Sequence, residues 1–248
     1  HQSRRRAHRA VRDREVRLIM AETTRHSFTE ELARVEAAGL GGLDLVAEQI
    51  DRVLEALENQ DVELASQVVA NDDLIDGRYL EVHQSVLSLF ALQAPVATDL
   101  RIVAALLHVI RHVERMGDQC VTIAKLIPLS GHQPPVQAEV LSRLLRMGRA
   151  ARSQVSQSKR AFGERNMELA EDLVRQDREI NALNREVFQL AIEVGTDADT
   201  REWAMHMAMV ARAIERIGDN AVDIGEQTAF VVTGLFREFS DSSHPSGP

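Results

Sequence analysis

Two stretches of this chain repeat each other in the same order. Residues 111–125, RHVERMGDQCVTIAK, align with residues 212–226, RAIERIGDNAVDIGE, and share the Arg, Glu, Arg, Gly, Asp, Val and Ile positions. Residues 56–72 align in the same way with residues 161–177. The two alignments have offsets of 101 and 105 residues. A chain with such a tandem repeat is predicted to fold as two related halves.

Helix-forming residues dominate the sequence, and helix breakers are rare. Aromatic residues make up only 4% of the 248 residues, too few for a typical β-rich core, whereas Ala, Leu, Glu, Gln and Arg are abundant. The six prolines stand at positions 95, 128, 134, 135, 245 and 248. Because breakers this sparse mark helix junctions, we predict an all-α fold with six long helices, arranged as a tandem repeat of two antiparallel three-helix bundles.

Local signals place the junctions between these helices. Ser27 and Glu30 form a capping box, which predicts that the first helix begins at Ser27 and continues to about residue 58. The next two helices are expected over residues 62–92 and 95–127. The predicted divisions of the chain are a disordered basic arm (1–26), the first bundle (27–127), a proline-rich linker (128–135), the second bundle (136–239) and a disordered tail (240–248).

Charge and cysteine content narrow the classes of function. The net charge of −9 disfavours general nucleic-acid binding, since the chain would repel phosphate backbones. Cys120 is the single cysteine, so we expect no intramolecular disulfide and a cytoplasmic location. No apolar run reaches the length of a membrane span. Residues 1–19 are instead rich in arginine, which indicates a nucleic-acid-binding or membrane-binding arm, or an extension upstream of a native start at Met20.

Acidic residues recur in pairs four positions apart, which places each pair on one helix face. Each half carries two such motifs, and antiparallel packing of neighbouring helices would bring their oxygen atoms together. Oxygen ligands favour hard or borderline cations, so we expect Fe, Zn, Mn or Mg at these motifs. The candidate ligands are Asp72, Asp76, Glu114, Asp118, Asp177, Asn181, Glu215 and Asp219.

The acidic pairs also have a simpler interpretation, in which neighbouring arginines neutralise them as a solvated salt-bridge face. Those arginines are Arg111, Arg115, Arg212 and Arg216. Gly117 and Gly218 precede the second acid of a motif at mid-helix, where glycine costs about 1 kcal/mol relative to alanine. A bound ion, a partner or a close neighbouring helix would explain these glycines. His108 and His112 lack counterparts in the second half, and we predict that they are packing or surface residues.

Catalytic motifs are scarce in this sequence. It contains no phosphate-cradling glycine loop, no serine nucleophile elbow and no HExxH metalloprotease motif. We therefore predict that the chain is not an enzyme. The alternatives to a non-enzymatic metal-binding protein are a helical scaffold without metal and a metal-dependent phosphoesterase with two ions.

Two stretches resemble a known family. Residues 89–126, LFALQAPVATDLRIVAALLHVIRHVERMGDQCVTIAKL, resemble the signature of the PhoU family of phosphate-uptake regulators, and residues 211–227, ARAIERIGDNAVDIGEQ, resemble its second copy. The resemblance covers residues 28–239. It implies two three-helix bundles that bind metal at the acidic motifs. Asn181 departs from this pattern, because a neutral amide stands where the family has an acid.

The same resemblance implies a role in phosphate homeostasis. PhoU-like proteins are cytoplasmic, non-enzymatic regulators that repress the phosphate-starvation response when phosphate is plentiful. Their partners are the phosphate ABC transporter and the sensor histidine kinase of that response. We therefore expect an adaptor that binds the ATPase subunit of the transporter and the kinase. Leu-rich and Met-rich helices favour a homodimer, and the net charge of −9 predicts no nucleic-acid partner.

Overall fold

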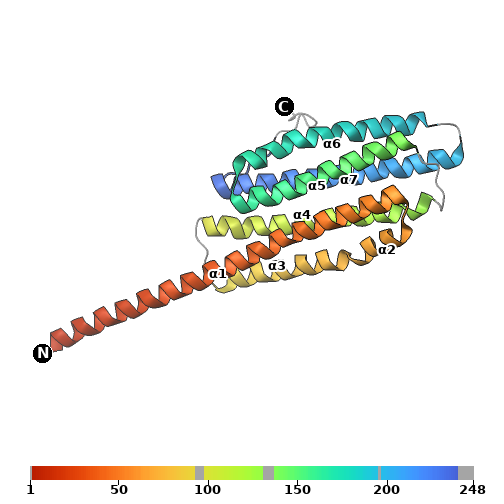
Figure 1. The fold of residues 1–248 in the computed structure, drawn as a ribbon. Coiled ribbons are helices and arrows are strands. Elements are labelled where there is room, and N and C mark those ends of the chain that lie inside the picture. The colour runs from red at the N-terminus through yellow and green to blue at the C-terminus, as the bar shows by residue number, and fades with distance from the viewer. Residues whose placement is uncertain (1, 93–97, 131–136, 195–196, 240–248) are drawn as a thin grey trace.

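The computed structural model describes residues 2–92, 98–130, 137–194 and 197–239, with side chains described from residue 25 onward except at residues 92 and 130. Within these residues every regular element is a helix (Figure 1). The elements are α1 (Gln2–Asn59), α2 (Val62–Ala70), α3 (Asp72–Leu92), α4 (Thr98–Leu126), the short 3₁₀ helix η1 (Pro128–Ser130), α5 (Ala138–Glu164), α6 (Met167–Glu193) and α7 (Ala198–Thr233). The all-α prediction is confirmed.

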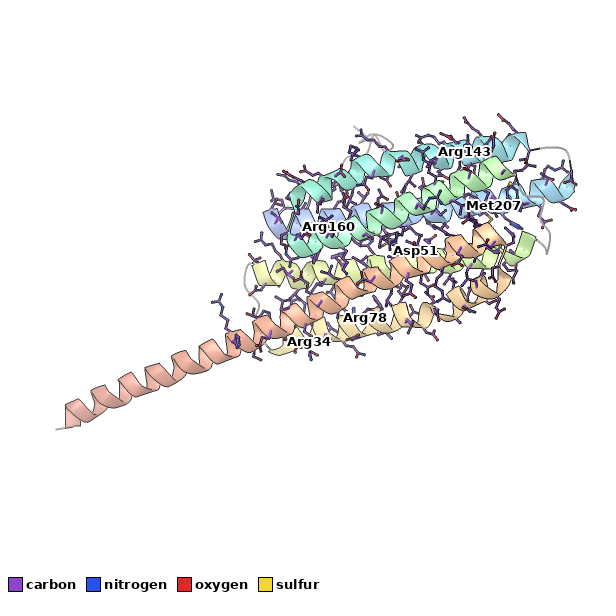
Figure 2. The ribbon with its side chains drawn as sticks, viewed as in Figure 1. Arg34, Asp51, Arg78, Arg143, Arg160 and Met207 are labelled. Carbon is purple, nitrogen blue, oxygen red and sulfur yellow. The ribbon has the colours of Figure 1, made fainter. Side chains whose placement is uncertain are left out.

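The helices form two three-helix layers that lie side by side. Helices α1, α4 and the α2–α3 pair make the first half, and α5, α6 and α7 make the second (Figure 1). The halves meet where α4 packs on α7 and α1 packs on α5. Apolar side chains from both halves, such as Leu106, Met116 and Met207, belong to one continuous core, whereas Arg34 and Arg160 lie on the outer surface (Figure 2). The predicted tandem bundle is therefore confirmed.

Helix α1 is longer than its sequence signals predict. The predicted start at Ser27 is wrong, because α1 begins at Gln2 and passes through Ser27 without a break. The carboxylate of Glu30 does not cap the helix; it lies 3.2 Å from His26 Nε2, one turn earlier. The upstream residues are mostly good helix formers, and no glycine or proline precedes Gly39, so nothing in the sequence ends the helix there.

The second predicted helix, residues 62–92, is interrupted at Asn71. Helix α2 ends there, with the Asn71 N–H donating to the Gln67 carbonyl oxygen at 2.9 Å, and α3 begins at the next residue. The corresponding helix of the second half, α6, has Gln176 at the equivalent place and is continuous. Asparagine competes with the helix backbone for hydrogen bonds, which explains the break. The predicted junction before this helix is confirmed, because the Asp61 carboxylate caps α2.

Three predicted features fall outside the described residues. Helix α4 is described only from Thr98, so the predicted start at Pro95 lies outside the described residues. The same holds for the part of the predicted linker after Ser130 and for the tail from residue 240.

Polar side chains tie the two halves together. His112 on α4 is mostly buried against α7, where its Nδ1 lies 2.8 Å from Asn220 Oδ1 and 3.4 Å from Asp223 Oδ2. Burial lowers the pKa of His112 despite these two partners. On the other side of the interface, Lys159 on α5 pairs with Asp44 on α1 at 2.7 Å. His112 is therefore a packing residue, as predicted, and it packs between the halves.

Candidate functional site

The first acidic face lies where α3 packs on α4. Asp72 and Asp76 come from α3, and Glu114 and Asp118 come from α4. Gly117 creates the space for this contact. A Cβ atom on Gly117 would lie 3.2 Å from Asp72 Oδ1 and 3.0 Å from Ile75 Cδ1. The mid-helix glycine is thus explained by close packing of the neighbouring helix, which delivers a carboxylate to the surface of α4.

Burial and mutual repulsion together raise carboxylate pKa values at this face. The pKa of Asp72 is raised to about 6, first by burial and then by the charges of Asp76, Asp118, Asp73 and Glu114. Burial also raises the pKa of Glu114, and the charges of Asp118 and Asp76 add to that effect. Carboxylates that raise one another's pKa lie close together, as the sequence predicted for these two helices. A cation at this face would relieve the repulsion.

The second half repeats the arrangement. Asp177 and Asn181 come from α6, and Glu215 and Asp219 come from α7. A Cβ atom on Gly218 would lie 2.9 Å from Asp177 Oδ1 and 3.2 Å from Ile180 Cδ1. Gly218 matches Gly117 at an offset of 101, and Asp177 and Ile180 match Asp72 and Ile75 at an offset of 105. Both sequence alignments therefore meet at one repeated contact.

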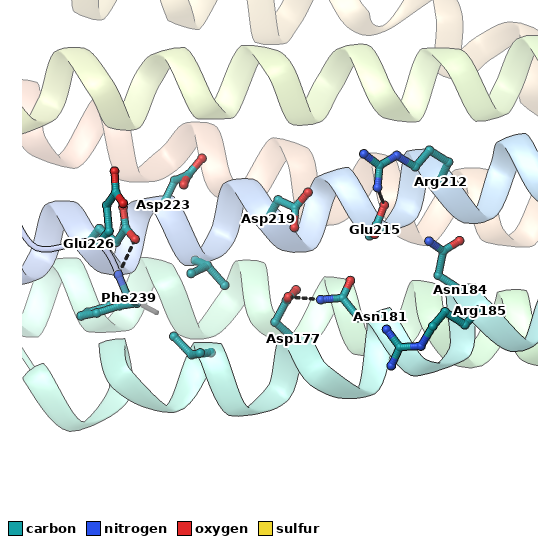
Figure 3. A pocket seen from close by; sticks show the side chains of 13 residues that line it. Asp177, Asn181, Asn184, Arg185, Arg212, Glu215, Asp219, Asp223, Glu226 and Phe239 are labelled. Atoms are coloured by element: carbon teal, nitrogen blue, oxygen red, sulfur yellow. Dashed lines mark hydrogen bonds and ion pairs between the residues drawn. The ribbon is translucent and has the colours of Figure 1, made fainter. Parts of the chain in front are cut away.

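Asn181 gives the second face a different chemistry. Its Nδ2 donates a hydrogen bond to Asp177 Oδ2 at 2.7 Å (Figure 3). The exposed fractions of Asp177 and Asn181 are only 4% and 9%, so this pair is buried. The amide replaces a repelling carboxylate with a donor. The departure noted in the sequence therefore organises the buried aspartate and does not simply remove a ligand.

An open groove of about 600 Å³ runs along the second face between α6 and α7 (Figure 3). Its walls include Asn184 and Arg185 on α6 and Asp223 and Glu226 on α7, none of which the sequence analysis named as site residues. Their spacing could have identified them in the sequence, because they continue the helix faces of the predicted ligands at steps of three or four residues.

The chain folds back over one end of this groove after α7. Gly234 ends α7 in the left-handed conformation, with φ of 77°. The Phe239 N–H then donates to Glu226 Oε1 at 2.7 Å. The Phe239 ring packs near Gly225, where an added Cβ would lie 3.3 Å from Phe239 Cε2. Burial raises the pKa of Glu226, although the Phe239 N–H opposes this shift.

Arginines neutralise part of each face. Arg111 pairs with Glu114 at 3.1 Å, and Arg212 forms the equivalent ion pair with Glu215. The salt-bridge interpretation therefore applies to the glutamate of each α4 and α7 motif. Such partly exposed pairs contribute about 0–1 kcal/mol each.

The donor atoms of both faces suit a metal ion. Carboxylate and amide oxygens are ligands that hard cations prefer. The glycine cradles, which are the close helix contacts at Gly117 and Gly218, bring these oxygens from two helices onto one face. Among the described residues, no three His, Cys, Asp or Glu side chains are already grouped as a metal would require. The residues fit an oxygen-ligated cation in the chemistry of their donor atoms, and binding would require side-chain rotation to bring those atoms together. No helix in the described part of the chain is long and apolar enough to cross a membrane.

The chain was compared with models of known protein families. The model of the PhoU domain matches the chain twice, over residues 43–127 and 144–228. The chain belongs to the PhoU family. The two matches are offset by 101 residues, like the repeat that carries Gly117 and Gly218.

Relatives and solved structures agree with this assignment. The phosphate-specific transport system accessory protein PhoU homolog of Clostridium acetobutylicum is 28% identical over 88% of this chain and 100% of its own length. The homolog of the same name from Zymomonas mobilis is 31% identical over 84% of this chain and 87% of its own length. Crystal structures of PhoU from Streptococcus pneumoniae and Pseudomonas aeruginosa superpose with TM-scores of 0.79 and 0.74, each at 25% identity, and cover 85% and 84% of this chain and 99% and 100% of their own.

Proposed function

We propose that this PhoU-family chain is a non-enzymatic regulator of phosphate uptake and of the phosphate-starvation response. The observation that carries the proposal is the double match to the PhoU domain, which spans both acidic faces. Relatives that match over most of the chain are named as accessory proteins of the phosphate-specific transport system. The chain would act in the cytoplasm and hold the response off when phosphate is plentiful.

The proposed mode of action is that of an adaptor. One partner is the ATPase subunit of the phosphate ABC transporter, and the other is the sensor histidine kinase of the response. Exposed apolar side chains are available for such contacts, because Leu80 and Leu87 on α3 and Met205 and Met209 on α7 are each more than half exposed. Exposed apolar side chains of this kind are typical of interaction surfaces. The same feature supports a proposed homodimer.

We further propose that both acidic faces bind metal ions, with Fe, Zn, Mn and Mg as the candidates. The first face would use Asp72, Asp76, Glu114 and Asp118, and the second would use Asp177, Asn181, Glu215 and Asp219. A bound cation would supply positive charge, either as a bridge to a partner's carboxylates or as a switch of surface charge. The pKa of Asp72, raised by burial and then by the charges of its acidic neighbours, supports this, because a cation would offset both effects.

The test is complementation in a bacterium that lacks its own PhoU and carries a reporter of the phosphate-starvation response. Wild-type protein is expected to silence the reporter in phosphate-rich medium and to copurify with the transporter ATPase. A variant with Glu114→Gln, Asp118→Asn, Glu215→Gln and Asp219→Asn is expected to lose silencing.

The control for this test changes four exposed acids away from both faces: Glu55, Glu58, Glu168 and Glu171, each to Gln. Silencing is expected to survive in this control. A wild-type protein that leaves the reporter active and binds neither partner would refute the regulatory proposal.

A further inference from the structure

A small cavity lies between α1 and the break that separates α2 from α3. Its volume is about 20 Å³, which is room for one water molecule. The residues that line it are Leu45, Glu48, Gln49 and Arg52 on α1, Asn71 at the break, and Leu74 and Ile75 on α3. None of the eight predicted metal ligands lines this cavity, so it is separate from both acidic faces.

Two polar atoms of the lining residues are buried without a hydrogen-bond partner in the part of the chain that the structure describes. One is the acceptor Oε1 of Gln49, a residue that is only 6% exposed, and the other is the donor Nε of Arg52. The Nη2 atom of the same guanidinium donates to Gln67 Oε1 at 2.7 Å, which holds the Arg52 side chain against α2. A buried donor or acceptor without a partner is destabilising, so these two atoms favour a group that can satisfy both.

The second half closes the equivalent place with a direct hydrogen bond. At the offset of 105, Gln157 corresponds to Arg52 and Gln176 corresponds to Asn71. Gln176 Nε2 donates to Gln157 Oε1 at 2.8 Å, and α6 passes through Gln176 without a break. Asparagine is one methylene shorter than glutamine, so the first half keeps a space where the second half has a contact between side chains.

Size and charge select the occupant of this cavity. A phosphate or any other polyatomic ion is too large for about 20 Å³. A bare cation would lie beside the Arg52 guanidinium, and an anion would lie beside the carboxylate of Glu48 and the oxygen of Gln49. Water is neutral and both donates and accepts hydrogen bonds, so one molecule can satisfy Gln49 Oε1 and Arg52 Nε together.

We propose that one ordered water molecule occupies this cavity, where it donates a hydrogen bond to Gln49 Oε1 and accepts one from Arg52 Nε. Water that inserts at an interruption of the helical hydrogen-bond ladder is a known cause of helix bending. The bound water therefore acts together with Asn71 to keep α2 and α3 apart.

This water has a consequence for the first acidic face. Helix α3 begins with Asp72, directly after the break, whereas the equivalent Asp177 lies in the middle of the continuous α6. The water that separates α2 from α3 therefore helps to set the position of Asp72 beside Gly117.

The first test is a crystal structure of the full chain at a resolution that shows ordered water. We expect electron density for one water molecule within hydrogen-bond distance of both Gln49 Oε1 and Arg52 Nε. The Asn71→Gln variant is expected to show no water there, because its longer side chain fills the cavity. A wild-type cavity that is empty, or that is closed by a rearranged side chain, would overturn the proposal.

Thermal unfolding tests the same water in solution. Gln49→Met keeps the length of the side chain and removes its hydrogen-bonding groups. If water bridges Gln49 and Arg52, this change leaves Arg52 Nε without a partner, and we expect the melting temperature to fall by about 2–4 °C. If Gln49 Oε1 has no partner, the change instead removes a buried unsatisfied oxygen. An unchanged or higher melting temperature would therefore contradict the proposal.

A double-mutant cycle separates the water from a general effect on packing. Asn71→Gln offers Gln49 and Arg52 a side-chain amide in place of the water, so its effect on the melting temperature is expected to be non-additive with that of Gln49→Met. Glu58→Gln, at an exposed residue further along α1, is the control and is expected to be additive with Gln49→Met. Additive effects in both pairs would show that Gln49 and Asn71 share no occupant.

Discussion

The two acidic faces share a backbone cradle and differ in how they carry charge. In both, a mid-helix glycine admits an aspartate and an isoleucine from the neighbouring helix. The first face gathers four carboxylates, and burial together with their repulsion raises the pKa of Asp72. The second replaces one carboxylate with Asn181, which donates to the buried Asp177. The comparison shows that the same backbone contact can present either four carboxylates that repel one another or a buried carboxylate that accepts a hydrogen bond from an amide.

Making the second face resemble the first has the largest expected effect on stability. Asn181→Asp removes the donor to Asp177 and adds a like charge in a buried position. We expect the free energy of unfolding in chelator to fall by about 2–3 kcal/mol. Urea unfolding measures this change, and adding a divalent cation is expected to recover part of it. Asp76→Asn, at an exposed position of the first face, is the matched change and is expected to be neutral or stabilising.

The glycine cradles offer the next test. Gly218→Ala places a Cβ 2.8 Å from Gln154 Oε1 and 2.9 Å from Asp177 Oδ1, both buried. We expect it to destabilise the protein by about 1–2 kcal/mol, because overpacking exceeds the gain in helix propensity. Gly117→Ala meets the flexible end of Ile75 at 3.0 Å and is expected to cost less.

Gly77→Ala is the control for both glycine changes. Beyond the nearby backbone of α3, no atom of the described residues lies within 4 Å of its added Cβ, so this change should stabilise the protein by up to about 1 kcal/mol. Equal effects at all three glycines in thermal unfolding would contradict the proposed role of the two cradles.

The charge on the first face also predicts a pH dependence. The pKa of Asp72 is about 6 in the folded protein, against an ordinary value of 3.8, so the folded state binds the Asp72 proton more tightly than the unfolded state does. Stability therefore falls as pH rises from about 4 to 6, and the penalty is fully present above that range. Solvent screening of this partly exposed group limits the penalty to about 1 kcal/mol.

Asp72→Asn is expected to flatten the stability curve between about pH 4 and 6, measured by urea unfolding in chelator. An Asp→Asn change far from this face should leave the slope of stability against pH unchanged. Asp61 is unsuitable for this control, because its carboxylate caps α2. Asp73→Asn, a neighbour on α3, should reduce the slope only slightly, since it is a lesser cause of the shift.

The helix break beside the first face has the smallest expected effect. Asn71→Gln places at the break the residue type that the continuous α6 has at its equivalent position. We expect a gain of a few tenths of a kcal/mol and slower amide hydrogen exchange at residues 71–74. An unchanged exchange rate would show that packing, and not the residue type, sets the break.

Much of this comparison was predictable from sequence because the repeat is local and periodic. The repeat placed a mid-helix glycine before an acid in each half, and in the structure both glycines contact an aspartate and an isoleucine of the neighbouring helix. The spacing of the acids predicted that those of α3 and α4 meet. Whether a glycine serves an ion or a neighbouring helix depends on interhelical distance, which spacing alone does not contain.

Other features depend on context that periodicity lacks. The capping box at Ser27 fails because the residues before it are equally good helix formers. The break at Asn71 reflects a single competing side chain within an otherwise helical pattern. The roles of Asn181 and Asn184 depend on which hydrogen-bond partners lie near them in the fold. In sequence the Asn181 amide resembles a weak metal ligand, but in the structure it donates a hydrogen bond to Asp177.

Elemental analysis by mass spectrometry tests the central claim, that both acidic faces are cation sites, most directly. Untagged wild-type protein, the four-acid face variant and the four-acid control variant would be purified side by side without chelator. The account predicts near-stoichiometric Fe, Zn, Mn or Mg in the wild type and the control, and its loss in the face variant. Equal trace metal in all three proteins would contradict the account and return these carboxylates to a salt-bridge role.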